Sequence, residues 1–266
     1  MTLPTAPRND QASGLRQMFG HTRVSFVPVV SNPHIGFGGV LLERLCTAFA
    51  ERQAKTLVVD AAERAGEAGE MAMVDLGQCI EPLSEHVSYL AARGLPIRFV
   101  DAAGSTRDFL QRVAEAAPRC DVVLVHAGAT ELSRLFSQKR AGGAWSDLPC
   151  PIVLAEDHPD SVTHAYAATK LLAHRAGLVV FDLLLGAAPQ SPRAERIADK
   201  LGACADAFFG GALRRWARID PAGDAGEAPG LDLRRLVAER LRGLRSADAD
   251  ASATPAASLR STAAFP

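Results

Sequence analysis

A glycine-rich segment near the start of the chain carries the residues best suited to chemistry. Residues 31–40 read SNPHIGFGGV, directly after an apolar run and before an amphipathic one. Glycines at such a junction let backbone N–H groups converge on an anion at a helix N-terminus, whose dipole also favours negative charge. The segment has no lysine to reach β- and γ-phosphates and no Ser or Thr after the glycines to hold magnesium. It is either a phosphate-binding loop without its usual side chains or a plain glycine-rich turn.

Few other residues suggest catalysis. His126 ends an apolar run and is either a catalytic base or a hydrogen-bonded histidine at a strand end. His158, His164 and His174 are too irregularly spaced to gather as metal ligands on one helix face. The five cysteines form no CxxC pair, so their pattern indicates neither zinc nor redox chemistry. We therefore expect no metal site and no catalytic residue.

The bulk composition favours a single domain in the cytosol. With 266 residues, 48% of them hydrophobic, the chain can bury a sizeable core. Its 29 basic and 30 acidic side chains nearly cancel, so we expect no direct contact with nucleic acid. No apolar run reaches the roughly 18 residues that spanning a bilayer requires. The N-terminal segment is polar and the cysteines fit a reducing compartment, so we expect neither secretion nor membrane spanning.

The elements that must position the glycine-rich segment alternate along the chain. Short apolar runs separated by helix-like segments are typical of βαβ units. They predict an α/β fold whose mostly parallel central sheet of about seven strands is flanked by helices. The expected strands are residues 24–30, 56–60, 96–100, 121–126, 151–155, 178–185 and 213–219. Apolar positions spaced by three and four residues predict helices at 39–52, 83–93, 106–116, 161–175 and 193–209.

The two ends of the chain depart from this alternation. We expect an N-terminal arm at residues 1–21, the α/β domain at 22–230, an amphipathic helix at 231–245 and a disordered tail at 246–266. Within the first strand, Pro28 conflicts with the pattern, because a proline cannot donate to a sheet ladder and is rare in central strands.

Several stretches resemble the MinD/ParA family of P-loop ATPases, and within it the FlhG (FleN, YlxH) regulators of flagellar number. DQASGLR at 10–16 is similar to the DQAxxLR segment that precedes the ATPase core in FlhG proteins. FVPVVSNPHIGFGGV occupies the place of the family's phosphate loop, and LVVDAAERAG that of its next strand. CDVVLVHAGAT and DSVTHAYAATK resemble two further family segments. The resemblance spans about residues 10–244 and implies a P-loop NTPase fold, a three-layer sandwich.

The chain departs from the family where that family does its chemistry. The positions of its two lysines, the magnesium-binding hydroxyl and two carboxylates hold Pro33, Gly38, Gly39, Ala62 and His126. Phosphoryl transfer depends on lysine and magnesium for charge compensation, so the resemblance implies a pseudo-ATPase with absent or very slow hydrolysis. Weak binding of ATP with magnesium is left open. The vestigial nucleotide-binding residues would be Gly36, Phe37, Gly38, Gly39, Val40, Asp60 and Asp182.

Asp182 has two interpretations. It stands in the place of the family's base-contacting asparagine and would meet an adenine edge. Alternatively, it is a polar residue at a strand end that satisfies local backbone groups.

The N-terminal arm contains a short amphipathic segment with Leu15, Met18 and Phe19 on one side. It is either a helix folded onto its own core or a partner-binding arm. The resemblance implies that it engages an FlhF-type GTPase and stimulates GTP hydrolysis, with Gln11 reaching the partner's nucleotide. The residues that this assigns to partner binding are Asp10, Gln11, Ala12, Leu15 and Arg16.

The segment at 231–245 is basic and amphipathic. Its apolar stripe either lies on the inner membrane surface, as the C-terminal helix of MinD-type proteins does, or packs on the sheet like any surface helix. The membrane interpretation assigns contact to Leu233, Leu236, Val237, Leu241 and Leu244.

These observations support three hypotheses for function. The leading one is a cytoplasmic regulator of flagellar number and placement that acts through an FlhF-type GTPase, with ATP hydrolysis lost or weak. The second is a working ATPase that forms a homodimer on ATP and cycles between cytosol and membrane. The third is a MinD-like accessory protein of another polar or secretion machine.

Overall fold

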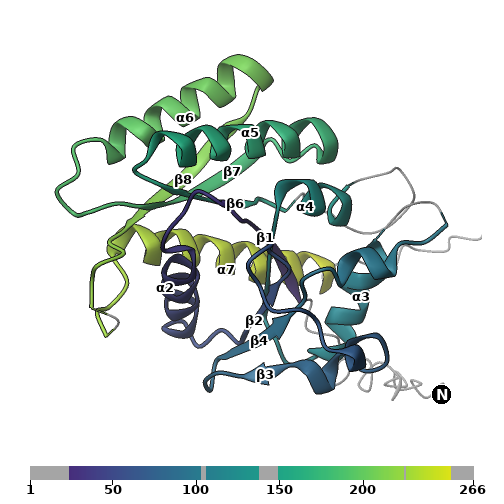
Figure 1. Ribbon diagram of the computed structural model, residues 1–266. Helices are drawn as coiled ribbons and strands as arrows, with labels where there is room; N and C mark the ends of the chain where they lie inside the picture. The colour runs from purple at the N-terminus through teal and green to yellow at the C-terminus, as the bar shows by residue number, and fades with distance from the viewer. Residues whose placement is uncertain (1–23, 103–105, 138–148, 225, 253–266) are drawn as a thin grey trace, which may run out of the picture.

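An eight-stranded sheet forms the centre of the molecule (Figure 1). The computed structural model describes residues 24–102, 106–137, 149–224 and 226–252. The strand order is β3-β4-β2-β5-β1-β6-β7-β8, and every pairing is parallel except that of β3 with β4. The strands are β1 (Ser25–Val30), β2 (Thr56–Asp60), β3 (Glu81–Pro82), β4 (Val87–Ala91), β5 (Val122–Ala127), β6 (Ile152–Glu156), β7 (Val180–Gly186) and β8 (Ala212–Ile219).

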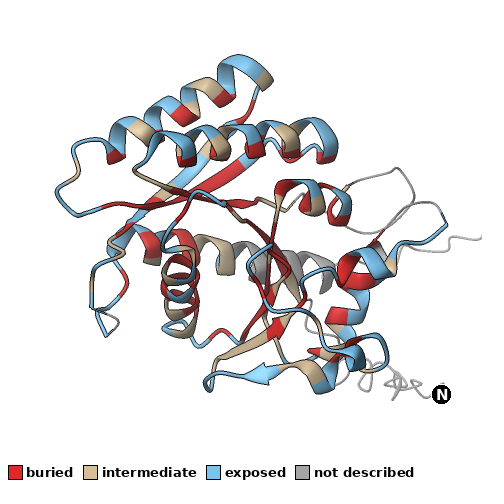
Figure 2. Ribbon diagram, viewed as in Figure 1, coloured by how far each residue is buried: buried red, intermediate tan, exposed pale blue. Residues whose placement is uncertain are grey.

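Helices cover both faces of the sheet (Figure 1). On one face, α3, α4, α5 and α6 pack on one apolar cluster, and on the other face α2 and α7 pack on a second cluster. Figure 2 shows the central strands buried between these layers, as expected for parallel strands with helices on both sides. The helices are α2 (Gly38–Ala50), α3 (Arg107–Ala116), α4 (Ala129–Leu135), α5 (Pro159–Ala176), α6 (Ala194–Phe209) and α7 (Leu231–Ser252). The α/β prediction is confirmed.

Two predicted elements are wrong. The helix predicted at 83–93 contains β4 instead, whose Tyr89 pairs with Val58 of β2. The strand predicted at 96–100 is a short 3-10 helix, η3 (Pro96–Phe99). Gly94, at φ +70°, turns the chain just after β4, and Pro96 then begins the 3-10 turn. Residues 87–91 form a strand because they pair in parallel with the outer edge of β2, and this tertiary pairing overrides the local spacing of apolar residues.

Pro28 is compatible with a central strand because of where its nitrogen points. Ser25 and Ser31 donate their backbone N–H groups to Asp121 and Ala127 on the β5 side. Since successive residues of a strand alternate, the nitrogen of Pro28 faces β6. The ladder between β1 and β6 begins only at Val29. The proline therefore lies just before this ladder begins, where a missing donor costs little.

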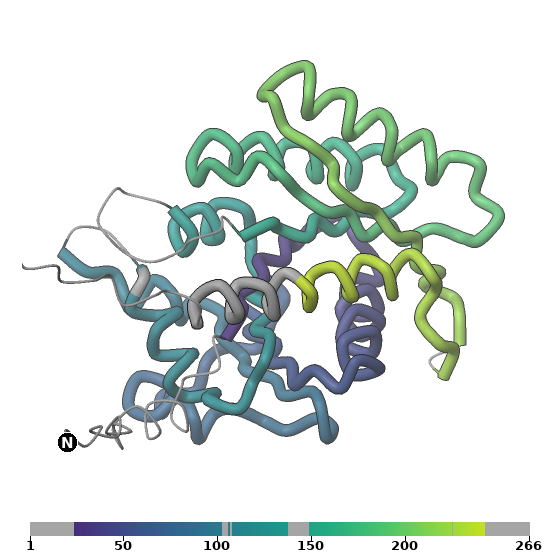
Figure 3. Tube along the Cα trace, turned by 180° about the vertical axis from the view of Figure 1, so that it is seen from behind, coloured from purple at the N-terminus to yellow at the C-terminus, as the bar shows by residue number. Residues whose placement is uncertain are grey.

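Helix α7 packs on the sheet, beside α2 (Figure 3). Leu233, Leu236 and Val237 are buried in the same cluster as α2, and Leu241 is partly buried against it. The apolar stripe therefore faces the protein core, and in this conformation these side chains are not presented to a membrane surface. The side chain of Leu244 lies outside the described residues. Within the described part of the chain, no helix is both long enough and apolar enough to cross a bilayer.

Candidate functional site

The glycine-rich loop lies at the carboxyl edge of the sheet, between the end of β1 and the start of α2. Asn32 fixes it there. The buried Asn32 amide donates hydrogen bonds to the Leu154 carbonyl, the Ser161 carbonyl and Ser161 Oγ, at 2.9 to 3.1 Å. Its own side-chain oxygen accepts the backbone N–H of His34. The loop is therefore tied to β6 and α5, and it takes the position that a phosphate-binding loop has in such a sheet.

A carboxylate from another strand occupies the anion position of this loop. Glu156, the last residue of β6, accepts the backbone N–H of Gly36 at 3.2 Å and that of Phe37 at 2.9 Å. Its own backbone N–H donates to Ser161 Oγ at 2.9 Å, which holds this strand end in place. Helix α2 has no acidic residue in its first turn, so Glu156 supplies the negative charge that the helix N-terminus favours.

The outer side of the loop is held by Arg64, which follows β2. Its guanidinium donates to the carbonyl of Pro33 at 3.0 Å and to that of Ile35 at 3.2 Å. On the α5 side, the His34 and His164 rings lie with their centroids 5.6 Å apart. Burial and the neighbouring His34 lower the pKa of His164. The loop is thus held by side chains from the segment after β2, from β6 and from α5.

Asp60 and His126 form a second cluster at the same edge, at the ends of the adjacent strands β2 and β5. His126 Nδ1 lies 2.8 Å from Asp60 Oδ1, and both side chains are largely buried. Tyr89 donates its hydroxyl to Asp60 Oδ2 at 3.3 Å. Burial raises the pKa of Asp60, but the hydrogen bonds from His126, Ala62 and Tyr89 outweigh it, so the pKa lies below its usual value. Burial and the Asp60 charge raise the pKa of Tyr89 to about 12.

This cluster resolves the two interpretations of His126 in part. The ring is hydrogen-bonded at a strand end, as the simpler interpretation expects, but its partner is the retained Asp60 carboxylate and not the backbone. Asp60 in turn is occupied by His126, Tyr89 and the backbone N–H of Ala62. Within the described ranges, no group of three or more His, Cys, Asp or Glu side chains is placed to hold a metal ion.

Asp182 lies elsewhere, and both predictions for it are wrong. It is the third residue of β7 and pairs with Ile152, the first residue of β6, so it lies toward the amino edge of the sheet. Its fully buried carboxylate binds Arg214 at 2.6 Å and Arg240 at 2.5 Å. It therefore cannot meet a base bound at the carboxyl edge, and its partners are two arginines from β8 and α7.

The predicted loop residues are brought together, and the structure adds others. Gly36 and Phe37 supply the amides, while Gly38, Gly39 and Val40 form the first turn of α2. Sequence reasoning missed Glu156, Arg64 and Tyr89. Glu156 had a signal, because an acidic residue directly after an apolar run ends at the same sheet edge as the loop. The N-terminal residues Asp10, Gln11, Ala12, Leu15 and Arg16 lie outside the described residues.

Comparisons with known proteins identify the fold. No protein-family model matches the chain, and no curated protein matches it. Solved structures do match. MinD in a MinC:MinD cell division protein complex from Aquifex aeolicus is 12% identical with a TM-score of 0.55, covering 83% of this chain and 96% of that one. Another structure of MinD from Aquifex aeolicus is 13% identical with a TM-score of 0.53, covering 83% and 97%.

A biosynthetic enzyme has a similar fold. Cobyrinic acid a,c-diamide synthase from Mycobacterium smegmatis, solved with an ATP analogue and magnesium, is 14% identical with a TM-score of 0.54, and the match covers 84% of this chain and 97% of that one. Identities this low show a shared fold and no shared activity. The chain therefore has the fold of the MinD-type P-loop ATPases.

Proposed function

We propose that this chain is a MinD/ParA-type regulator that does not hydrolyse ATP and acts by contacting a partner protein. The observation that carries the proposal is the Glu156 carboxylate, which accepts the Gly36 and Phe37 amides where a phosphate would bind. A nucleotide phosphate would have to displace this carboxylate, and its negative charge would repel that of Glu156 at close range.

The surrounding residues do not fit ATP with magnesium. Lysine and a magnesium-held hydroxyl normally compensate the phosphate charges, and the corresponding positions are Pro33, Gly38 and Gly39. The retained Asp60 is bound to His126. Arg64 is a cation close to the loop, and its guanidinium is engaged with the carbonyls of the loop. Any nucleotide would therefore bind weakly through backbone amides and would not be turned over.

ATP turnover by the purified full chain tests the proposal. We expect no magnesium-dependent phosphate release above the buffer blank. In Glu156→Gln the repulsion is removed while the side-chain size is kept, so affinity for an ATP analogue should rise by about tenfold. Hydrolysis should not return, because the lysines are still absent. Glu195→Gln, an exposed glutamate in the first turn of α6, is the matched control and should change neither quantity.

Robust hydrolysis by the wild-type chain would contradict the proposal. It would favour the alternative of a working ATPase that dimerises on ATP and cycles between cytosol and membrane. The buried positions of Leu233, Leu236 and Val237 argue against the membrane step of that cycle. The proposed regulator therefore does not use α7 as a membrane anchor.

The partner that we propose is an FlhF-type GTPase, with flagellar number and placement as the process regulated. The support is the similarity of residues 10–16 to the DQAxxLR segment. Adding the full chain to such a GTPase should accelerate GTP hydrolysis, and Gln11→Ala should abolish the acceleration. Gln17→Ala, in the same arm, is the matched control. If the wild-type chain gives no acceleration, an accessory role in another polar or secretion machine becomes the better hypothesis.

A further inference from the structure

Two histidines lie against each other between the glycine-rich loop and helix α5. His34 belongs to the loop and is exposed, whereas His164 belongs to the second turn of α5 and is partly buried. Their rings are arranged edge to face, with the centroids 5.6 Å apart and an angle of 61° between the ring planes. Neutral imidazole is the commonest side-chain ligand of metal ions in proteins. The two rings are therefore a candidate pair of metal ligands.

The separation of the two rings suits one shared ion. Zinc binds an imidazole nitrogen at about 2.0 to 2.1 Å, so two rings at a tetrahedral angle on one ion have their centroids about 5 Å apart. The observed separation of 5.6 Å is close to this distance. Because the side chain of His34 is exposed, a small rotation of its ring can close the difference.

The surroundings of the pair hold both residues in place. The ring of His164 donates a hydrogen bond to the backbone carbonyl of Ser31, which leaves its other nitrogen as an acceptor. Metal-binding histidines commonly donate their second ring N–H to a carbonyl in this way. The backbone N–H of His34 donates to Asn32 Oδ1 at 3.1 Å, and the Asn32 amide is in turn bonded to Ser161 of α5. The loop and the helix thus keep the two imidazoles together.

The charges near the pair do not select an ion, so the ligands must. The Glu63 carboxylate is near enough to His164 to raise its pKa against the larger lowering by burial. The Arg64 guanidinium binds the loop carbonyls on either side of His34 and offsets this negative charge. Imidazole nitrogen suits nickel, copper and zinc, whereas magnesium and calcium prefer oxygen. Since no cluster of three metal-binding side chains occurs in the described ranges, water would complete the coordination.

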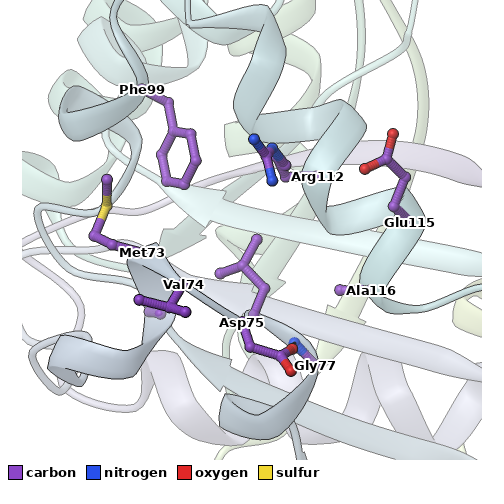
Figure 4. A pocket seen from close by; sticks show the side chains of 10 residues that line it. Met73, Val74, Asp75, Gly77, Phe99, Arg112, Glu115 and Ala116 are labelled. Carbon is purple, nitrogen blue, oxygen red and sulfur yellow. The ribbon is translucent and has the colours of Figure 1, made fainter.

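A small hollow beside helix α3 is less suited to a cation. Its volume is about 210 Å³, and the acidic residues in its lining are Asp75 and Glu115. Figure 4 shows their carboxylates at separate places around the hollow. Asp75 already accepts hydrogen bonds from Gly77 and Gln78, and the cationic Arg112 lines the same hollow. Glu115 is therefore a suitable control position for a test of the histidine pair.

We propose that His34 and His164 bind one transition-metal ion of the class that prefers imidazole, with water in the remaining coordination positions. The bound ion joins the loop directly to α5, in addition to the hydrogen bonds of Asn32, and so stiffens the loop. The spacing of histidines along α5 gave no sign of this site, because His34 comes from another part of the chain. The inference does not rest on the proposed function, since neither a nucleotide nor a partner protein takes part.

Titration of the purified full chain with nickel chloride tests the site, because Ni²⁺ suits imidazole and thiolates favour softer ions. Isothermal titration calorimetry should show one ion bound per chain. His34→Ala and His164→Ala should each weaken binding at least about tenfold, since loss of even an outer partner of a metal ligand costs that much. His34 is exposed, so His34→Ala should fold normally, and its melting curve checks that. Nickel should raise the melting temperature of the wild type and not that of His34→Ala.

Two control variants accompany this titration. His174→Ala changes an exposed histidine in the last turn of α5, and Glu115→Gln changes an acidic residue of the hollow. Both should leave nickel affinity unchanged. The proposal is overturned by the absence of saturable binding, by binding that either histidine variant leaves unchanged, by an equal loss in a control variant, or by one ion shared between two chains. ATP turnover and GTPase stimulation bear on the proposed function and not on this site.

Discussion

Gly186, the last residue of β7, lies directly beside Glu156, the last residue of β6. A Cβ added at Gly186 would come within 3.0 Å of Glu156 Cγ. A glycine at this position leaves room for the glutamate side chain to turn onto the loop amides. The carboxylate in the phosphate position thus depends on residues from two neighbouring strands as well as on the loop itself.

Gly186→Ala should therefore shift the Glu156 side chain by a few tenths of an ångström and weaken its hydrogen bonds to the loop amides. Overpacking of this kind costs about 1 to 3 kcal/mol of stability, measurable by urea denaturation. With these hydrogen bonds weakened, the loop should bind an ATP analogue more tightly than in the wild type. Gly69→Ala, where an added Cβ meets nothing within 4 Å, is the matched control. Unchanged nucleotide affinity in Gly186→Ala would argue that the glutamate does not block the loop.

The buried carboxylate of Asp182 should be far more important for stability than a surface ion pair. It is fully buried and binds Arg214 and the nearly buried Arg240. Asp182→Ala would leave these two cations without their carboxylate, which costs about 3 to 5 kcal/mol in comparable buried pairs. Arg215→Ala, which breaks a surface pair with Glu239, should cost less than about 1 kcal/mol. Equal losses in guanidinium denaturation would contradict this account.

Tyr89 should titrate well above an ordinary tyrosine, because burial and the Asp60 carboxylate raise its pKa to about 12. The chain has two tyrosines, so Tyr166→Phe leaves Tyr89 as the only phenol to follow by ultraviolet absorbance. The raised pKa favours the neutral folded form. The stability that neutral Tyr89 contributes to the folded state is therefore complete below pH 10 and is lost as the pH rises toward 12. Asp60→Asn should shift the titration back toward 10, and an unshifted curve would exclude the Asp60 contact as a cause.

Substitutions at two leucines of α7 distinguish packing of this helix on the sheet from binding to a membrane. Leu236 is fully buried, whereas Leu231 in the same helix is 68% exposed. Leu236→Ala should cost about 2 to 5 kcal/mol through the cavity that it leaves, and Leu231→Ala should be nearly neutral. Vesicle flotation with anionic lipids should give the same result for the wild type and both variants. A small stability loss in Leu236→Ala together with reduced flotation would restore the membrane interpretation.

Much of the fold could be predicted from local pattern. The strands at the centre of the sheet are short apolar runs buried on both faces, and the helices between them carry one apolar stripe each, so composition and period identify both. The prediction failed at residues 83–93, where apolar spacing over such a short stretch does not separate a helix from a strand. Residues 87–91 form β4 because they pair in parallel with the edge of β2.

The candidate site, too, could be predicted from the sequence only in part. The sequence by itself determined that a glycine-rich loop follows the first strand without the lysines or hydroxyl of a phosphate-binding motif, because those are facts of residue type and order. Only the tertiary structure decided what occupies the loop. Glu156 is 119 residues from Phe37 along the chain, and it reaches the loop because parallel strands end at one edge. The tertiary structure also decided that Asp182 pairs with two arginines, toward the opposite edge of the sheet. The reason is that strand register, and not residue type, sets which end of a strand a side chain occupies.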